Sequence, residues 1–335
     1  MGLNQPETRS KLAAYVARVA DSPVEITETR KLSGGAIQEN WALDVVVERG
    51  SWAGAHQLVL RQDSATQVAA SRGRSDEFYL LKAAHAAGVR VPTPCFLCED
   101  PDVLGRPFFL MHRLAGTAAG HRLTKADDNP DLIRELAENL ARIHTILPTQ
   151  PGLAFLGTAS PEPALQAVRD YRAYLDAMGA QRPAIEYGLA WLQENAPTSD
   201  AITLCHRDYR TGNLMVDDNH LSGILDWEFA GWGDPLEDIG WFMAKCWRFG
   251  ANHKEAGGLG ARDHFYAAYE HQAGQTIDRT QIQYWEVMAH VRWATIACQQ
   301  AARHRSGAEV SLELALTGYV VPELEYEILQ MTGAG

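Results

Sequence analysis

The sequence predicts an α+β protein of two lobes, in which a small antiparallel β-sheet lobe with one helix precedes a larger, mainly α-helical lobe. Strand-like runs fill the first part of the chain, and apolar residues at helical spacing dominate the remainder. The 335 residues, of which 46% are hydrophobic, are enough to form two cores. We expect the lobes to span residues 1–113 and 114–335.

The first lobe is expected to begin with an amphipathic helix, because the N-terminus is too polar for a secretory signal. Glycine-containing turns then separate strand-like segments, which we expect at residues 24–31, 38–48 and 56–61. The next stretch predicts a helix that Ser75 caps and Gly88 ends. VPTP predicts an extended connection, and FFLMHRLAG predicts a last strand that leads into a hinge near Gly116.

The second lobe is expected to be helical with one β interruption. In DLIRELAENLARIHTI, the apolar residues follow a period of 3.6. We expect further helices at 162–178, 181–195, 235–247, 257–274, 279–304 and 309–331. The interruption consists of the strands AITLC, NLMV and LSGILD, and DDNH predicts a tight turn between the last two.

Composition excludes several classes of function. The chain has 30 basic and 42 acidic residues, and its net charge of −12 disfavours a nucleic acid partner. No apolar run approaches the ~18 residues of a membrane span, so we expect a cytoplasmic protein without a membrane partner. The pair Cys95 and Cys98 lacks the second pair that a zinc site requires, which favours two unligated thiols. Nothing in the sequence indicates an oligomeric state.

The stretch LCHRDYRTGNLMV, from Leu204 to Val216, places a polar loop between two apolar strands. A loop held at both ends is typical of catalytic loops. Asp208 is a carboxylate suited to orient or deprotonate a hydroxyl, and Asn213 offers a neutral oxygen to a metal. Asp226, in ILDWE after the hairpin, would complete an oxygen site for magnesium. The alternative is a buried polar network without catalysis.

The order of these motifs resembles a known family. HRDxxxxN, followed by a hairpin and an aspartate, resembles the catalytic core of protein-kinase-like enzymes. LDWE and GDPLEDIGW resemble the aminoglycoside phosphotransferase and choline kinase-like family of small-molecule kinases. The wider sequence around these motifs is similar to that of a bacterial branch of the family, which is related to kinase-like domains fused to acyl-CoA dehydrogenases. The resemblance implies a protein-kinase-like two-lobe fold, with a nucleotide-binding first lobe and a catalytic, substrate-binding second lobe.

The resemblance also implies roles for individual residues of the loop. Asp208 would be the catalytic base or the residue that orients the substrate hydroxyl, and His206 would brace the loop. Arg210 would support catalysis, because its guanidinium group suits phosphate oxygens. Asn213 and Asp226 would hold Mg²⁺ on the nucleotide phosphates. Glu228 would act behind the metal ligands or face the substrate.

For the nucleotide, the family expects a cation on the third strand paired with a glutamate on the next helix. Here these residues would be Glu77 and Arg61, an arginine where the family usually has lysine. The turn over the phosphates would be formed by Ser33, Gly34 and Gly35, although SGG also suits an ordinary hairpin turn. The backbone expected at the adenine edge comprises Met111, His112 and Arg113.

Other polar residues have structural explanations. Asp234 as N-cap, a proline at the first helical position and Glu237 three residues after the cap predict a capping box. In the family, the position of Asp238 holds the backbone of the catalytic loop. His144 ends an apolar helical stripe and is expected to be a packing residue with its hydrogen bonds satisfied, and His112 is as well explained by a structural role.

The resulting hypothesis is transfer of the γ-phosphoryl group of ATP or GTP to a hydroxyl group of a small molecule, assisted by Mg²⁺. The acceptor would be aminoglycoside-like, choline-like or a hydroxyacyl metabolite. The alternative is a pseudokinase or regulatory module that binds nucleotide without turnover, which Arg61 in the lysine position motivates. A serine hydrolase of the α/β type is disfavoured, because the sequence contains no GxSxG.

Overall fold

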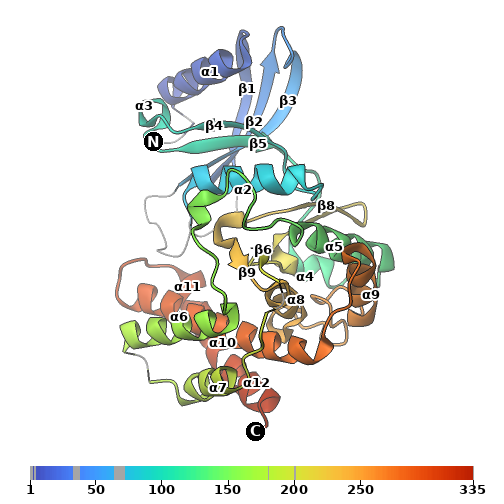
Figure 1. The fold of residues 1–335 in the computed structure, drawn as a ribbon. Coiled ribbons are helices and arrows are strands. Elements are labelled where there is room, and N and C mark those ends of the chain that lie inside the picture. Colours follow the sequence, from blue (N-terminus) through green and yellow to red (C-terminus); the bar gives the residue numbers. More distant parts are fainter. Residues whose placement is uncertain are drawn as a thin grey trace. The chain divides into compact units, whose positions relative to one another are not determined.

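The computed structural model describes residue 3 and residues 5–32, 38–63, 72–179, 181–199 and 201–334 (Figure 1). Contacts between segments group the chain into two compact units. The first unit contains Met1–Thr117, Pro151–Phe155 and Met215–Ala230, and the second contains Ala118–Gln150, Leu156–Leu214 and Gly231–Gly335. A small antiparallel sheet and a largely helical remainder confirm the predicted α+β class. The division into domains at residue 113 stays a prediction.

The first unit is built on a five-stranded sheet in which all paired neighbours are antiparallel. In spatial order the strands are β1 (Val24–Lys31), β2 (Gln38–Val47), β3 (Gly54–Asp63), β5 (Phe108–His112) and β4 (Pro94–Cys98). The strands expected at residues 24–31, 38–48 and 56–61 and in FFLMHRLAG are confirmed. Strand β4, which pairs with β5, was not predicted; it begins at the last residue of the extended connection expected at VPTP. As an edge strand, β4 accommodates a proline at its first position.

The helices of the first unit are α1 (Pro6–Ala20), α2 (Arg74–Ala86) and the single turn α3 (Pro101–Leu104). Leu12 and Val16 of α1 join Leu43, Leu58 and Leu60 of the sheet in one buried core. The predicted cap of α2 was wrong. Gly73 occupies the N-cap position and Ser75 lies inside the helix, while Gly88 adopts the left-handed conformation that follows a helix end.

A β-hairpin formed by β7 (Leu214–Asp217) and β8 (His220–Ile224) also belongs largely to the first unit. Its turn residues Asp218 and Asn219 have φ angles of 45° and 65°. Two left-handed residues are the requirement of a two-residue hairpin turn, so the predicted tight turn is confirmed. Gly116 packs beside this hairpin, where an added Cβ would lie 2.2 Å from the Val216 carbonyl oxygen. Only glycine fits there.

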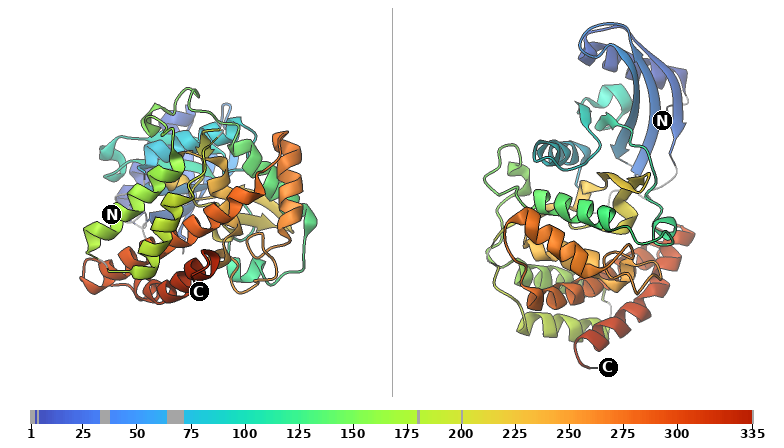
Figure 2. Two further views of the ribbon diagram at one scale, coloured as in Figure 1. Left: turned by 60° about the horizontal axis from the view of Figure 1, so that its bottom comes forward. Right: turned by 90° about the vertical axis from the view of Figure 1, so that its right-hand side faces the viewer.

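The second unit is helical. Its helices are α4 (Gly120–Leu123), α5 (Pro130–Ile143), α6 (Pro163–Met178), α7 (Pro183–Glu194), α8 (Pro235–Met243), α9 (Arg262–Ala273), α10 (Arg279–Arg305), α11 (Leu312–Thr317) and α12 (Val321–Met331). The long helix α10 packs against α6, α7, α8 and α12 (Figure 1 and Figure 2). The buried side chains of α6, α7, α10 and α12 form one core, to which Ile185, Leu189, Val291 and Ile328 belong.

Three predicted helices differ from the observed ones. The helix expected at 235–247 ends at Met243 and is followed by a 3₁₀ turn. The helix expected at 257–274 begins at Arg262, because Gly257 and Gly258 take left-handed φ angles of 60° and 75°. The helix expected at 309–331 is divided into α11, a 3₁₀ turn and α12, and a proline lies at the start of α12.

The second unit also contains a small sheet of β6 (Thr203–Cys205) and β9 (Gly231–Gly233), which pair antiparallel. β9 corrects the expectation of a single β interruption. With the sequence GWG, this strand has no alternation of polarity to reveal it, and only its pairing with β6 makes it a strand.

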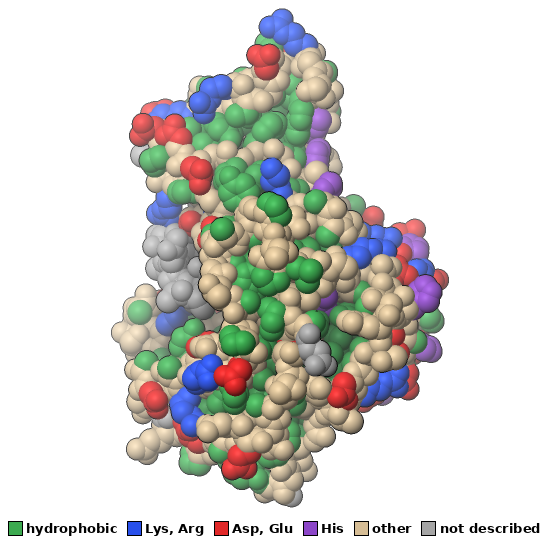
Figure 3. Space-filling model, in the orientation of Figure 1, with side chains coloured by type: hydrophobic (Ala, Val, Ile, Leu, Met, Phe, Trp, Pro, Cys, Tyr) green, Lys and Arg blue, Asp and Glu red, His purple; other side chains and the backbone are tan. Residues whose placement is uncertain are grey.

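Within the described parts of the chain, no helix combines the length and the apolar character that crossing a membrane requires. Figure 3 shows acidic and basic side chains interspersed on the face that it draws.

Candidate active site

The polar loop predicted to be catalytic lies in the second unit, between β6 and β7. It ends in a 3₁₀ turn over Thr211–Asn213. The loop turns sharply, since Arg207 has a φ angle of 61° in the left-handed region. Tyr209 is fully buried and donates from its hydroxyl group to the Leu136 carbonyl oxygen at 2.8 Å, which anchors the middle of the loop to α5.

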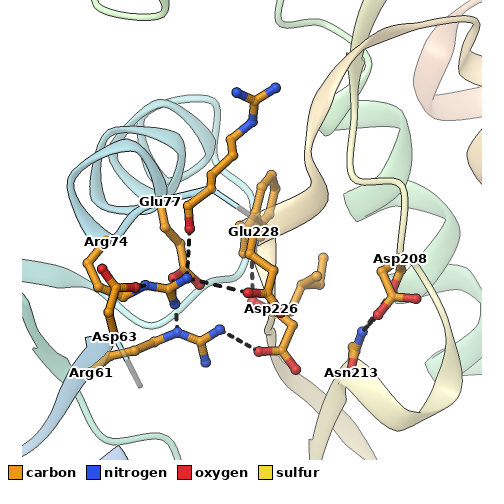
Figure 4. A network of polar contacts seen from close by, with 11 residues as sticks. Arg61, Asp63, Arg74, Glu77, Asp208, Asn213, Asp226 and Glu228 are labelled. Atoms are coloured by element: carbon orange, nitrogen blue, oxygen red, sulfur yellow. Dashed lines mark hydrogen bonds and ion pairs between the residues drawn. The ribbon is translucent and has the colours of Figure 1, made fainter. Parts of the chain in front are cut away.

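Three side-chain donors hold the Asp208 carboxylate. Oδ1 accepts from Arg210 Nε at 3.0 Å and from Trp241 Nε1 at 3.2 Å. Oδ2 accepts from Asn213 Nδ2 at 2.5 Å (Figure 4). The same Nδ2 also donates to the Asp208 carbonyl oxygen at 2.9 Å. The structure therefore brings together Asp208, Arg210 and Asn213 of the predicted loop. Trp241 was not predicted; its position in DIGW, three residues after Asp238, was the available signal.

Asp238 of α8 holds the backbone of this loop. Its carboxylate accepts from the His206 amide at 2.6 Å and from the Arg207 amide at 2.7 Å, which confirms the expected bracing role. Burial alone would raise the pKa of the Asp238 carboxyl, but the hydrogen bond and charge of His144 and the charge of His206 lower it overall. His206 is fully buried and its Nδ1 accepts from the Asp208 amide at 3.1 Å, so it contributes to the shape of the loop.

His144, Cys205 and Asp238 form a buried cluster whose potential ligand atoms lie within 4.8 Å of one another, among the residues that the structure describes. His144 contacts Tyr269 Oη at 2.7 Å and Asp238 at 3.3 Å, which confirms the expectation of a satisfied packing residue. Cys205 donates to the Asp234 carbonyl oxygen at 3.2 Å, and burial raises the pKa of its thiol. Because hydrogen bonds already engage all three side chains, we interpret this cluster as a brace for the loop.

The predicted N-cap of α8 is confirmed, because the Asp234 carboxylate accepts from the Leu236 amide at 2.8 Å. The glutamate of the expected capping box, Glu237, instead lies 3.4 Å from Arg207 Nε and 3.5 Å from Arg292 Nη1. Glu237 therefore contributes charge to the loop and to α10.

In the first unit, Arg61 and Glu77 form the expected ion pair, with Arg61 Nε 3.0 Å from Glu77 Oε2 (Figure 4). The same guanidinium group donates from Nη2 to Asp226 Oδ1 at 2.6 Å. Burial alone would lower the pKa of Arg61, but the carboxylates of Glu77, Asp226 and Glu228 raise it. Arg61 is consequently a permanent cation held between α2 and the segment that follows β8.

A second arginine that the sequence reasoning missed lies beside this pair. Arg74 is 1% exposed, and it contacts Asp63 at 2.9 Å, Glu77 and, at 3.4 Å, Glu228. Its place three residues before Glu77 on α2 is the signal that was available. Two buried guanidinium groups thus meet four carboxylates, an accumulation of negative charge that suits a cationic ligand.

The two acidic residues after β8 have different surroundings. Asp226 has a left-handed φ angle of 61°, and its side chain is 36% exposed. Glu228 lies in a 3₁₀ turn (Trp227–Phe229), and its side chain is 9% exposed against Arg74. The exposed carboxylate suits direct binding of a ligand, whereas the buried one suits an indirect role.

The remaining predicted nucleotide residues are Ser33, Gly34, Gly35, Met111, His112 and Arg113. The first three lie outside the described residues. Met111 is buried in β5, and the amides of His112 and Arg113 donate to the carbonyl oxygens of Thr93 and Gln57 at 2.9 Å each. Their contact with adenine stays a prediction.

Known proteins resemble this chain in sequence and in fold. Acyl-CoA dehydrogenase family member 10 of Mus musculus is 31% identical over 194 residues, which cover 55% of this chain and 18% of that protein. This chain thus spans less than a fifth of the length of that relative.

Among solved structures, a protein of Ralstonia eutropha described as a possible aminoglycoside phosphotransferase superimposes with a TM-score of 0.77. It is 19% identical, and the match covers 97% of this chain and 98% of that one. The GDP complex of aminoglycoside 2'-phosphotransferase-IIIa gives a TM-score of 0.65 at 14% identity and covers 96% of this chain and 99% of that one. These similarities confirm the kinase-like fold. The model of the phosphotransferase enzyme family (APH) matches residues 28–285, and the chain belongs to this family.

Proposed function

We propose that this phosphotransferase transfers the γ-phosphoryl group of ATP or GTP to a hydroxyl group of a small molecule, assisted by magnesium. The observation that carries the proposal is the Asp208 carboxylate, which three side-chain donors hold in one orientation. Family membership supports phosphoryl transfer. Structural neighbours solved with GDP, and with ADP and hygromycin B, support a nucleotide donor and a small acceptor.

In this proposal, Asp208 orients the acceptor hydroxyl and receives its proton as the oxygen attacks the γ-phosphorus, while the bond from that phosphorus to the bridging oxygen breaks and ADP or GDP leaves. A carboxylate that is already held in place loses little conformational freedom during the reaction, so positioning contributes to the rate. Arg210 neutralises charge on the transferring phosphoryl group, since its Nε holds Asp208 and leaves the rest of the guanidinium fork for phosphate oxygens. His206 shapes the loop through its contact with the Asp208 amide.

The residue types proposed as metal ligands suit magnesium. Asn213 commits its amide nitrogen to Asp208, which leaves the carbonyl oxygen Oδ1 as its potential ligand atom. Asp226 adds a partly exposed carboxylate, and hard oxygen donors are what this cation prefers. When bound, magnesium would neutralise charge on the phosphates of the nucleotide. Glu228, which is buried against Arg74, would support these ligands without contacting the metal itself.

The first unit would bind the phosphates of the nucleotide. Arg61 would contact them as a cation whose orientation Glu77 fixes. An arginine offers several donors in one plane and so replaces the single ammonium of a lysine with a broader contact. Ser33, Gly34 and Gly35 would cover the phosphates, and the backbone at 111–113 would meet the base.

The acceptor is proposed only by class. Kanamycin and hygromycin B are bound by structural neighbours, which supports an aminoglycoside-like acceptor. Choline-like and hydroxyacyl acceptors remain alternatives, the latter because of the relative named for acyl-CoA dehydrogenase.

The test is incubation of the purified chain with γ-labelled ATP or GTP, magnesium and a library of aminoglycosides, amino alcohols and hydroxyacyl compounds. We expect label to appear in at least one acceptor, only with magnesium present. The absence of transfer to all acceptors, together with no rise in melting temperature on adding magnesium and nucleotide, would overturn the proposal.

One observation favours the alternative of a nucleotide-binding module without turnover. Arg61 already pairs with Asp226, so this arginine competes with magnesium for a proposed ligand. Asp208→Asn separates the two functions. It should preserve binding of magnesium nucleotide in either case, and it abolishes turnover only if the chain is an enzyme.

A further inference from the structure

Helix α8 contacts the catalytic loop with two side chains that lie one turn apart. Asp238 accepts hydrogen bonds from the amides of His206 and Arg207, so it fixes the backbone. Trp241, three residues later on the same face of the helix, donates from its indole nitrogen to Asp208 Oδ1 at 3.2 Å. One helix therefore sets both the path of the loop and the orientation of its carboxylate.

The Trp241 ring is itself fixed by its neighbours. It is 3% exposed, and the Arg292 guanidinium carbon lies 4.4 Å from its centroid. Trp247 packs against it with the ring centroids 4.9 Å apart, and Arg210 lies over Trp247 at 4.7 Å. Because Arg210 also donates to Asp208, the contacts close into a ring that runs through Asp208, Trp241, Trp247 and Arg210.

We propose that Trp241 is a positioning residue that holds Asp208 Oδ1 through its indole N–H during phosphoryl transfer. This inference rests on the proposed function. Arg210 is a charged fork whose remaining nitrogens suit phosphate oxygens, so a shift of its guanidinium group toward the substrate would loosen its Nε contact with Asp208. An indole N–H is a neutral donor and lacks the charge that attracts a guanidinium group to phosphate. Trp241 therefore keeps Asp208 oriented when Arg210 engages the transferring group.

The first test is Trp241→Phe in the full chain, which removes the donor and keeps an aromatic ring. We expect kcat to fall by about 10- to 100-fold, the effect of losing a hydrogen bond to a charged group in the transition state, while KM for the nucleotide stays unchanged. The matched control is Trp285→Phe. Trp285 is 1% exposed in the helical core, and its indole nitrogen has no acceptor among the described residues. This variant should lose stability and keep kcat within about twofold.

An equal fall of kcat in both variants would overturn the proposal, because it would reduce Trp241 to a packing residue. The acceptor used is the one identified for the proposed function. If the wild-type chain transfers phosphate to no acceptor, the proposed function has failed. The contact between Trp241 and Asp208 can then still be tested by the ¹⁵N spectrum described below.

The second test is the ¹⁵N spectrum of the indole groups of the nine tryptophans. The resonance that Trp241→Phe removes identifies Trp241, or Trp241→Tyr identifies it if the first variant does not fold. Asp208→Asn should shift this resonance and leave that of Trp285 in place, because only the first indole bonds to the carboxylate. A Trp241 resonance that does not respond to Asp208→Asn would contradict the contact.

Discussion

The arginine network of the first unit and the proposed catalytic loop of the second hold their side chains by different means. The arginine network, which comprises Arg61, Arg74 and their four carboxylate partners, relies on buried opposite charges. The catalytic loop relies mainly on neutral donors that surround two carboxylates, namely backbone amides, an indole and a side-chain amide.

The difference has an energetic consequence. Removal of one charge from a buried ion pair leaves its partner uncompensated, which is among the costliest single changes in a protein. Removal of a neutral donor costs less in stability, but it frees a side chain to take other orientations. We therefore expect changes in the arginine network to act first on stability, and changes around Asp208 to act first on turnover.

The largest effect on stability is expected from Arg74→Met. This side chain is 1% exposed and contacts three carboxylates, so its loss should lower the free energy of unfolding by about 3–5 kcal/mol. Urea denaturation at pH 7 measures this change. The control is Arg134→Met. The Arg134 side chain is 50% exposed beside Asp131 and Glu138, so its loss should lower the free energy of unfolding by less than about 1 kcal/mol. Equal costs for the two variants would contradict the buried network.

A smaller effect, dependent on pH, is expected from Asp238→Asn. Loss of the charged acceptor for two amides should cost about 1.5–3 kcal/mol at pH 7. Because the folded chain lowers the pKa of this carboxyl below 3.8, its stabilisation is present above the unfolded pKa and is lost as the pH falls through the folded value. The difference in the free energy of unfolding between wild type and variant should therefore become smaller only below about pH 4.

Asp234→Asn is the matched control on the same helix. Burial raises the pKa of Asp234 above 3.8 despite its hydrogen bonds. The free energy of unfolding should therefore change with pH in the opposite direction to that expected for Asp238. The wild-type chain should lose stability relative to this variant as the pH rises through the folded pKa. If both variants changed with pH in the same direction, the account of Asp238 would be wrong.

The smallest effect is expected from Gly240→Ala, which tests how closely α8 packs on α10. A Cβ at this position would lie 2.4 Å from Trp285 Cβ and 2.7 Å from its carbonyl carbon, which cannot move separately from α10. We expect a cost of about 1–3 kcal/mol, measured by thermal unfolding. Gly188→Ala should cost less, because its obstacles are the methyl groups of Ile328 and Val291. A larger cost at Gly188 would contradict this difference.

The sequence predicted most of the fold, because local patterns determine most of its elements. Strand-like segments between glycine-containing turns located β1, β2 and β3, the apolar run FFLMH located β5, and apolar residues at helical spacing located α5, α6, α7 and α10. The errors arose where pairing or backbone geometry decides. β9 is a strand only because β6 pairs with it, and Gly257 and Gly258 delay α9 through left-handed conformations that the apolar pattern does not show.

The candidate site could be predicted where residues belong to a motif. Asp208, Asn213, Asp226 and the Arg61–Glu77 pair follow from motif positions. Arg74 and Trp241 do not, since their partners come from distant segments of the chain: Arg74 meets Glu228, and Trp241 meets Asp208. Such contacts depend on tertiary packing, which spacing along the sequence reveals only as proximity to Glu77 or Asp238.

We propose that the arginine network serves nucleotide binding and that Asp208 serves phosphoryl transfer. The most direct measurement is the nucleotide Kd and the turnover number of Asp208→Asn and Arg61→Met, determined in parallel with magnesium present. We expect Asp208→Asn to keep its nucleotide Kd while kcat falls by about 10²- to 10⁴-fold, and Arg61→Met to bind nucleotide more weakly. Turnover at the wild-type rate in Asp208→Asn, with the same acceptor, would contradict this proposal.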